Sequence, residues 1–271
     1  MTDTTLEAKR ILVDVFRRMS PGEKWLRLDD LYRDARAMHA AGVRLRNPLA
    51  TLRDIHEAWL IDNLGFTHTE LIREPPSVES LTSTLRELRD FLTIVQGMGI
   101  PYALGGSMAS SIYGIDRHTR DADVTLEPFP LREAEFADSF GPAYYKDLPA
   151  ICQAVQTRGS FNIINTSTGF KIDVFICKDE AFGQSAMNRR VAVSLPDKPQ
   201  ETIAVYSPED IILFKLRWFR LGNEASDQQF KDALGVLAVQ GDKLDQRYLD
   251  DWSAKLGLAD LLARARRENA V

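Results

Sequence analysis

The chain has 271 residues, of which 44% are hydrophobic and 27% are charged, and its formal net charge is −5 at pH 7. This composition supplies a core for one large domain or two smaller ones. The mildly acidic balance argues against a protein coated with basic residues for nonspecific nucleic-acid binding. No apolar run is long enough to span a bilayer and the first residues are polar, so we expect a cytoplasmic protein that does not contact membranes. The two cysteines, Cys152 and Cys177, are expected to be small buried thiols.

The first part of the chain is predicted to be helical. Apolar residues recur at helical spacing over residues 6–16. Ser20 as a cap and Pro21 in the first turn predict a second helix, which we expect to stop at Gly42. A third helix is expected over residues 50–64. The segment REPPSVES, with its two prolines and a new cap at Ser77 or Ser80, predicts a linker.

The middle of the chain alternates between strand and helix patterns. After a helical pattern over residues 81–98, the strand candidates are IPYALGG, DADVTLE, a hairpin in GSFNIINTSTGFKIDVFI, and the two runs RRVAVSL and ETIAVYS. Between them, SMASSIYG predicts a short helix that Gly114 closes, and residues 131–157 are predicted to be mostly helical.

The last part of the chain is again helical. SPEDIILFKLRWFRLG carries a cap at Ser207, a proline at the first turn and Gly222 at its end. We therefore predict an α+β fold, with a small mixed β-sheet flanked by helices. Its regions would be a helical N-terminal region (1–75), a strand-and-helix core (76–206) and a C-terminal helical lobe (207–271).

Two acids in the core predict a metal site. On a strand, Asp121 and Asp123 point to the same face. Carboxylates held so close repel each other, and a cation between them relieves the repulsion. Oxygen ligands on a rigid strand suit Mg²⁺, which usually keeps waters and takes substrate phosphates as further ligands.

The turn before these acids predicts phosphate binding. Gly105 and Gly106 let the backbone turn sharply and let a ligand approach. The helix that begins near Ser107 presents free N–H groups at its N-terminus, which suit a phosphate. The ligand that would use both the turn and the acids is a metal-bound triphosphate.

Asp173 is a candidate third acid. It lies in the apolar run FKIDVFI, where a carboxylate needs a partner. If its strand lies beside the strand of Asp121 and Asp123, three carboxylates converge. Such a trio can hold two metal ions, and Asp173 could act as the base toward an attacking hydroxyl.

These segments resemble the nucleotidyltransferase signature of the DNA polymerase β superfamily. That signature is an apolar residue, Gly and Gly or Ser, then an Asp-x-Asp pair after about a dozen residues, then an acid on a later strand. The resemblance covers residues 85–220. It implies a nucleotidyltransferase core and transfer of a nucleoside monophosphate from an NTP, with Mg²⁺ or Mn²⁺, onto a hydroxyl. The matching residues are Leu104, Gly106, Ser107, Asp121, Asp123 and Asp173.

Residues 206–232 are similar to bacterial nucleotidyltransferases of the abortive-infection toxin type. In that group a lysine on this helix and an aspartate on the next complete the pocket, and Lys215 and Asp232 match in order and setting. The resemblance implies that Lys215 contacts the triphosphate. It also implies an RNA acceptor, such as a tRNA 3′ end, and an antitoxin partner.

Several alternatives stay open at this point. Lys215 either meets an anion or extends its ammonium to water, and Asp232 either joins the site or pairs locally. Arg117 and Arg120 either steady a phosphate or a polynucleotide acceptor, or pair with Asp116 and Asp121. The acceptor is RNA, a small molecule such as an aminoglycoside, or a protein hydroxyl. A non-enzymatic protein that senses nucleotides or mediates interactions with the same fold is the third class of function.

Overall fold

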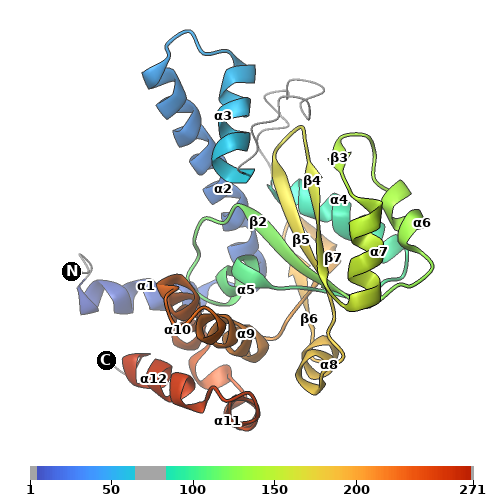
Figure 1. Cartoon of the computed structure of the whole chain (residues 1–271). Helices are drawn as coiled ribbons and strands as arrows, with labels where there is room; N and C mark the ends of the chain where they lie inside the picture. The colour runs from blue at the N-terminus through green and yellow to red at the C-terminus, as the bar shows by residue number, and fades with distance from the viewer. Residues whose placement is uncertain (1–4, 65–83, 270–271) are drawn as a thin grey trace. The chain divides into compact units, whose positions relative to one another are not determined.

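The computed structural model describes residues 5–64 and 84–269, and Figure 1 labels their helices and strands. The chain divides into two compact units, each assembled from separated stretches. The first unit contains residues 1–26, 103–117 and 180–271, and the second contains residues 27–102 and 118–179. The predicted linker with its cap at residue 77 or 80 lies outside the described residues. The division into three successive regions stays a prediction.

The second unit carries a mixed sheet with strand order β3-β4-β5-β2. β2 is parallel to β5, whereas β4 is antiparallel to both β5 and β3. The predicted hairpin is the β4–β5 pair. The strands are β2 (Asp121–Leu126), β3 (Tyr144–Tyr145), β4 (Ser160–Asn165) and β5 (Phe170–Ile176). The helices are α2 (Pro21–Arg46, which starts in the first unit), α3 (Leu52–Leu64), α4 (Thr84–Gly97), α6 (Glu133–Asp138) and α7 (Leu148–Thr157).

The first unit also combines strands and helices. β7 pairs in parallel with β1 and antiparallel with β6. The strands are β1 (Tyr102–Leu104, of which Tyr102 belongs to the second unit), β6 (Val191–Leu195) and β7 (Lys198–Val205). The helices are α1 (Leu6–Arg18), α5 (Gly106–Tyr113), α8 (Ala181–Asn188), α9 (Pro208–Leu221), α10 (Asp227–Gln240), a short 3₁₀ turn (Gly241–Lys243), α11 (Gln246–Lys255) and α12 (Ala259–Asn269).

Capping groups fix several helix starts at the predicted residues. The Ser207 hydroxyl accepts a hydrogen bond from the Asp210 amide at 3.2 Å, which starts α9. At the start of α2, Ser20 and Glu23 each accept from the other's backbone N–H, a reciprocal capping pair. The predicted stop at Gly42 is wrong, because α2 continues to Arg46. A glycine costs a helix only about 1 kcal/mol, whereas the proline two residues after Arg46 cannot continue it.

Close helix packing holds α5 against α10 in the first unit. A Cβ atom at Gly114 would lie 2.9 Å from backbone atoms of both Gly235 and Val236, closer than side-chain carbons come. Glycine at this position therefore lets the two backbones approach. Met108 and Ile112 of α5 are buried beside this contact. The turn that precedes α5 therefore lies in the same compact unit as α10.

The predicted α+β class, a mixed sheet flanked by helices, is confirmed. Two details differ from the sequence prediction. The stretch 131–157 includes the strand β3, which pairs with β4, in addition to its two helices. Cys177 is buried as expected, but Cys152 is exposed, because α7 buries Ile151 and Ala154 instead. In the described part of the chain, we find no helix that is both long and apolar enough to cross a membrane.

Candidate active site

Three acids lie on one face of the second unit's sheet. The parallel register of β2 and β5 places Asp123 beside Asp173 and Asp121 beside Lys171. Along both strands these half-buried positions alternate with fully buried apolar ones, so all four side chains share one face. The predicted trio required that the strand of Asp173 lie beside the strand of Asp121 and Asp123. The structure meets this condition.

A lysine that the sequence analysis did not single out lies among these acids. The Lys171 ammonium is 2.7 Å from Asp173 Oδ2 and 3.5 Å from Asp121 Oδ2. Burial acts to lower the Lys171 pKa, but the hydrogen bond to Asp173 and the charges of Asp173 and Asp121 raise it overall. Lys171 therefore stays protonated and supplies positive charge to the acid cluster.

Asp173 is more enclosed than Asp121 and Lys171. Its side chain is 19% exposed, against 34% for Asp121. Burial raises the Asp173 pKa, and Lys171 opposes this rise only in part. On the neighbouring strand β4, Asn162 lies in register with Asp173. With its amide nitrogen facing the acid, Asn162 donates to Asp173 Oδ1 at 2.6 Å.

The chemistry of these acids suits a metal ion better than their arrangement does. Carboxylate oxygens are the ligands that Mg²⁺ prefers, and the acids lie on one face, so the donor types fit. In the present arrangement, however, no three Asp, Glu, His or Cys side chains within residues 5–64 and 84–269 are grouped to hold a metal ion. Lys171 supplies the cationic charge instead. The predicted metal-ligand role of Asp121, Asp123 and Asp173 stays a prediction.

In the first unit, the predicted Gly-Gly-Ser turn connects β1 to α5. Gly106 has φ +57°, a left-handed conformation that glycine adopts without strain. Gly105 precedes the helix, and its carbonyl accepts the hydrogen bond from the Ala109 amide at 3.1 Å. Ser107 is buried in the first turn of α5. The turn therefore leads into α5 through a left-handed glycine, and its role in phosphate binding stays a prediction.

The same unit brings Lys215 and Asp232 together. The Lys215 ammonium lies 2.8 Å from Asp232 Oδ2, and both side chains are almost completely buried. Gln228 also donates to this carboxylate at 2.8 Å, and Ser110 of α5 donates at 3.4 Å. Of the two readings of Lys215 left open, extension to water is wrong: the ammonium meets an anion, and that anion is Asp232.

Arg117 completes the cluster around Asp232. Its Nε and Nη2 atoms lie 2.9 and 3.0 Å from the two carboxylate oxygens, a two-pronged contact. Burial acts to raise the Asp232 pKa, but the bonds from Arg117 and Lys215 outweigh burial, and the pKa lies below its usual value. The sequence had suggested Asp116 and Asp121 as partners of Arg117. Arg120, in the second unit, donates instead to the Asp62 carbonyl at 3.2 Å.

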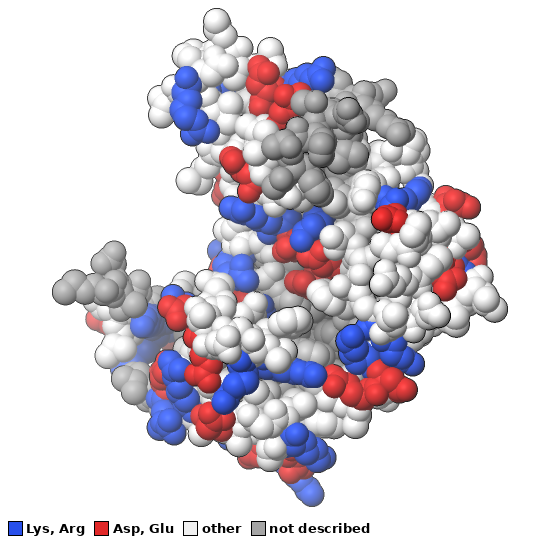
Figure 2. Space-filling view, viewed as in Figure 1, with Lys and Arg blue, Asp and Glu red and all other residues white. Residues whose placement is uncertain are grey.

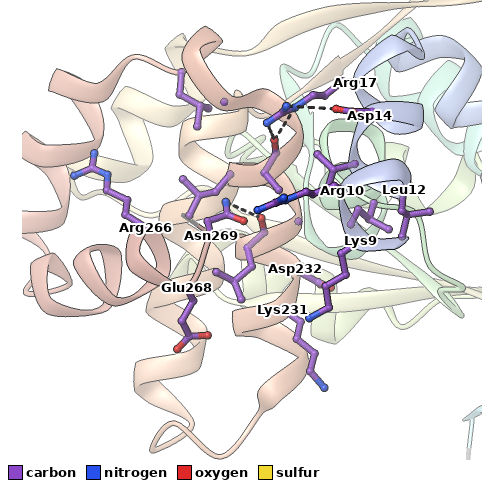
Figure 3. A pocket seen from close by; sticks show the side chains of 18 of the residues that line it. Lys9, Arg10, Leu12, Asp14, Arg17, Lys231, Asp232, Arg266, Glu268 and Asn269 are labelled. Carbon is purple, nitrogen blue, oxygen red and sulfur yellow. Dashed lines mark hydrogen bonds and ion pairs between the residues drawn. The ribbon is translucent and has the colours of Figure 1, made fainter. Parts of the chain in front are cut away.

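A pocket of about 1250 Å³ in the first unit extends from Asp232 between α1, α10 and α12 (Figure 3). Arg17 anchors α1 beside it, with two hydrogen bonds to the Ala238 carbonyl at 3.1 and 2.8 Å. Apolar and basic side chains both line the pocket. Its lining includes Leu6, Val13, Leu234, Leu237, Lys9, Arg10, Lys231 and Arg266.

The pocket has more unpaired positive than negative charge. Of the five acids that line it, Asp14 pairs with Arg17, Asp232 with Lys215 and Arg117, and Glu268 with Arg264. The other two acids are Asp116 and Asp242. Lys9, Arg10 and Lys231, in contrast, have no carboxylate partner among the residues that the structure describes. In Figure 3, Lys9 and Lys231 lie at the Asp232 end of the pocket.

Comparison with known proteins finds weak structural similarity and no sequence match. No family model matches the chain, and no curated protein matches it. Three solved structures, each 16% identical, show a distant likeness. The match to the solution structure of the antibiotic-resistance factor ANT(2″)-Ia covers 67% of this chain and 91% of that chain, with a TM-score of 0.36. An antigenic nucleotidyltransferase-like protein from Paracoccidioides brasiliensis covers 71% and 95%, with a TM-score of 0.37. The crystal structure of ANT(2″)-Ia with adenylyl-2″-tobramycin covers 67% and 97%, with a TM-score of 0.33.

Proposed function

We propose that the protein is a Mg²⁺-dependent nucleotidyltransferase that moves a nucleoside monophosphate from an NTP to an acceptor hydroxyl. The observation that carries this proposal is the register of β2 and β5, which gathers Asp121, Asp123 and Asp173 on one face. Such a set of oxygen ligands is chemically suited to Mg²⁺. When bound, the ion would neutralise phosphate charge and lower the pKa of the attacking hydroxyl.

Phosphate binding is assigned to residues of the first unit. The left-handed Gly106 opens the turn, and Gly105 and Ser107 flank it at the start of α5, and the N-terminus of a helix favours an anion. An ammonium carries three donors, so Lys215 can bind a phosphate oxygen while keeping its bond to Asp232. Arg117 and Gln228 keep that carboxylate satisfied.

In the proposed reaction, the acceptor oxygen attacks the α-phosphorus of the NTP. The bond between the α-phosphorus and the bridging oxygen breaks, and pyrophosphate leaves with that electron pair. Asp173 accepts the hydroxyl proton, since burial raises its pKa toward a value that suits a base. Asp121 and Asp123 would serve as metal ligands in this scheme.

The acceptor we favour is an RNA end. Lys9, Arg10 and Lys231 give the first unit's pocket cations that no described carboxylate neutralises, and RNA phosphates would supply the missing charge. The alternative acceptors are a small molecule or a protein hydroxyl. On the face in Figure 2, basic and acidic side chains are interspersed, and the acidic net charge also suits these alternatives. A toxin role with an antitoxin partner predicts growth arrest on expression.

Label transfer from each α-labelled NTP, with Mg²⁺, tests the proposal directly. The acceptors are total bacterial RNA, lysate protein and a panel of aminoglycosides. The critical variant is Asp121→Asn. The matched control is Asp138→Asn, the same change at an exposed residue that ends α6.

We expect label in the RNA pool that disappears with Asp121→Asn and persists with Asp138→Asn. Label in another pool would retain the reaction and reject the RNA acceptor. No label in any pool, with NTP binding still measurable, would reject the enzyme and favour a nucleotide-sensing protein. Growth of cells that express the wild-type chain, compared with Asp121→Asn, tests the toxin role separately.

A further inference from the structure

Lys171 occupies a position that the proposed reaction leaves unused. Its ammonium lies 2.7 Å from Asp173 and 3.5 Å from Asp121, so one cation contacts acids on two neighbouring strands. The Lys171 side chain is 27% exposed, which leaves it partly shielded from water. These contacts arise from the fold itself. Lys171 is opposite Asp121 in the register and two residues before Asp173, on the same face.

A positive charge here has a direct consequence for any divalent ion. The same carboxylate oxygens cannot pair fully with an ammonium and also bind a metal ion closely, because two cations within a few ångströms repel each other. The carboxylates of Asp121 and Asp173 must therefore release Lys171 before they can close around an ion.

We propose that Lys171 is an internal counter-cation, which a divalent ion must displace from Asp121 and Asp173 before it binds. The proposal rests on the proposed function, because it takes these acids as the metal ligands. A bound triphosphate supplies the anion that a displaced ammonium needs. Lys171 thus makes the acids weak ligands for the free ion and stronger ligands when metal and nucleotide arrive together.

Binding of Mn²⁺ alone, followed by the electron paramagnetic resonance signal of the free ion, tests the competition without any catalysis. Lys171→Met removes the charge and keeps most of the side-chain length, and Lys171→Gln is a second neutral variant. Lys171→Arg keeps the charge. The matched control is Lys178→Met, which changes the net charge equally, although Lys178 donates to the Arg158 carbonyl rather than to an acid.

We expect both neutral variants to bind Mn²⁺ roughly tenfold more tightly than the wild type, a modest change for a partly exposed pair. Lys171→Arg and Lys178→Met should bind like the wild type. Adding Asp121→Asn to Lys171→Met should abolish the gain. Adding a non-hydrolysable NTP should strengthen Mn²⁺ binding more in the wild type than in Lys171→Met, because only the wild type has an ammonium to transfer to the phosphates.

Two results would overturn the proposal, and they are distinguishable. Equal or weaker Mn²⁺ binding by both neutral variants, while Asp121→Asn still lowers the affinity, would reject the competition and leave the proposed metal site intact. Absence of Mn²⁺ binding in every variant, with and without the NTP, would reject the metal site itself, and the competition with it. Thermal unfolding of each variant confirms that the compared proteins are folded.

Discussion

Replacing Asp232 by asparagine tests whether the buried cluster of the first unit holds Lys215 in place. The Lys215 ammonium is 2.8 Å from the carboxylate, and the two side chains are only 6% and 5% exposed. Asp232→Asn removes the negative charge and leaves this ammonium desolvated, whereas Arg117, at 32% exposure, can turn to water. We expect the free energy of unfolding to fall by about 2–4 kcal/mol, somewhat less than for an isolated buried pair, because one of the two cations can relax.

Lys215→Met should cost less, about 1–2 kcal/mol, because Arg117 and Gln228 still satisfy the carboxylate. In the double variant neither charge of the pair remains, so its loss should be smaller than the sum of the single losses by roughly 1.5 kcal/mol. Urea unfolding at neutral pH, followed by far-ultraviolet circular dichroism, measures all three values. If the free energy of unfolding depends equally steeply on urea concentration in all variants, their unfolded states are comparable.

The matched control is the same cycle at Arg220 and Asp260. Their atoms approach to 2.6 Å, but the side chains are 40% and 67% exposed, so we expect a much smaller coupling energy than for Lys215 and Asp232, because water screens the exposed charges. Losses at Lys215 and Asp232 that add to within about 0.5 kcal/mol would refute the reasoning. They would mean that burial does not strengthen this pair over the exposed one.

Three further predictions concern other residues. Gly106→Ala puts a Cβ on a residue with φ +57°, so we expect the free energy of unfolding to drop by about 1–2 kcal/mol. The affinity for an NTP, measured by calorimetry, should fall as well. An unchanged NTP affinity would contradict the assignment of this turn as a phosphate-binding loop. Burial lowers the His56 pKa to about 4, below its usual 6.5. The unfolded chain therefore binds more protons, and stability should be lost as pH falls from about 6.5 to 4, a loss that His56→Gln should reduce in urea unfolding at each pH. Burial likewise lowers the Lys24 pKa to about 8 from 10.5. The free energy of unfolding should therefore increase as the pH rises from about 8 to 10.5, and Lys24→Met should remove this increase. If the pH dependence persists in His56→Gln or in Lys24→Met, a group other than the one replaced must cause it.

Local signals in the sequence predicted much of the fold because their causes are local. The cap at Ser207, the strand alternation around Asp121 and the glycine turn at Gly106 each depend on residues within one turn or one strand. The adjacency of β2 and β5 was stated as a condition, since periodicity shows which face a side chain occupies but not which strands are neighbours. The structure supplied that pairing.

The contacts that the sequence could not predict either join residues far apart in the chain or involve a residue type that usually has another role. Arg117 and Asp232 are separated by 115 positions, and α5, which lies just before Arg117 in the chain, packs on α10, which carries Asp232. Lys171 has no local signal that marks it, because a lysine in an alternating strand usually lies on a solvated face. Its role in the cluster comes from Asp121 on the neighbouring strand. The identity of the bound ligand depends on partners outside the chain.

Each unit combines separated stretches of the chain, and this affects how the protein folds during translation. The second unit has all its residues once position 179 is made, whereas the first needs residues 180–271 as well. At about 5–20 residues per second, those residues take several seconds to appear. During that time Phe16 of α1 and Met108 and Ile112 of α5, all buried in the finished protein, lack α10, against which α1 and α5 pack. Nascent chains should therefore engage chaperones late in synthesis, and a premature stop near the C-terminus should yield aggregation rather than a smaller folded protein.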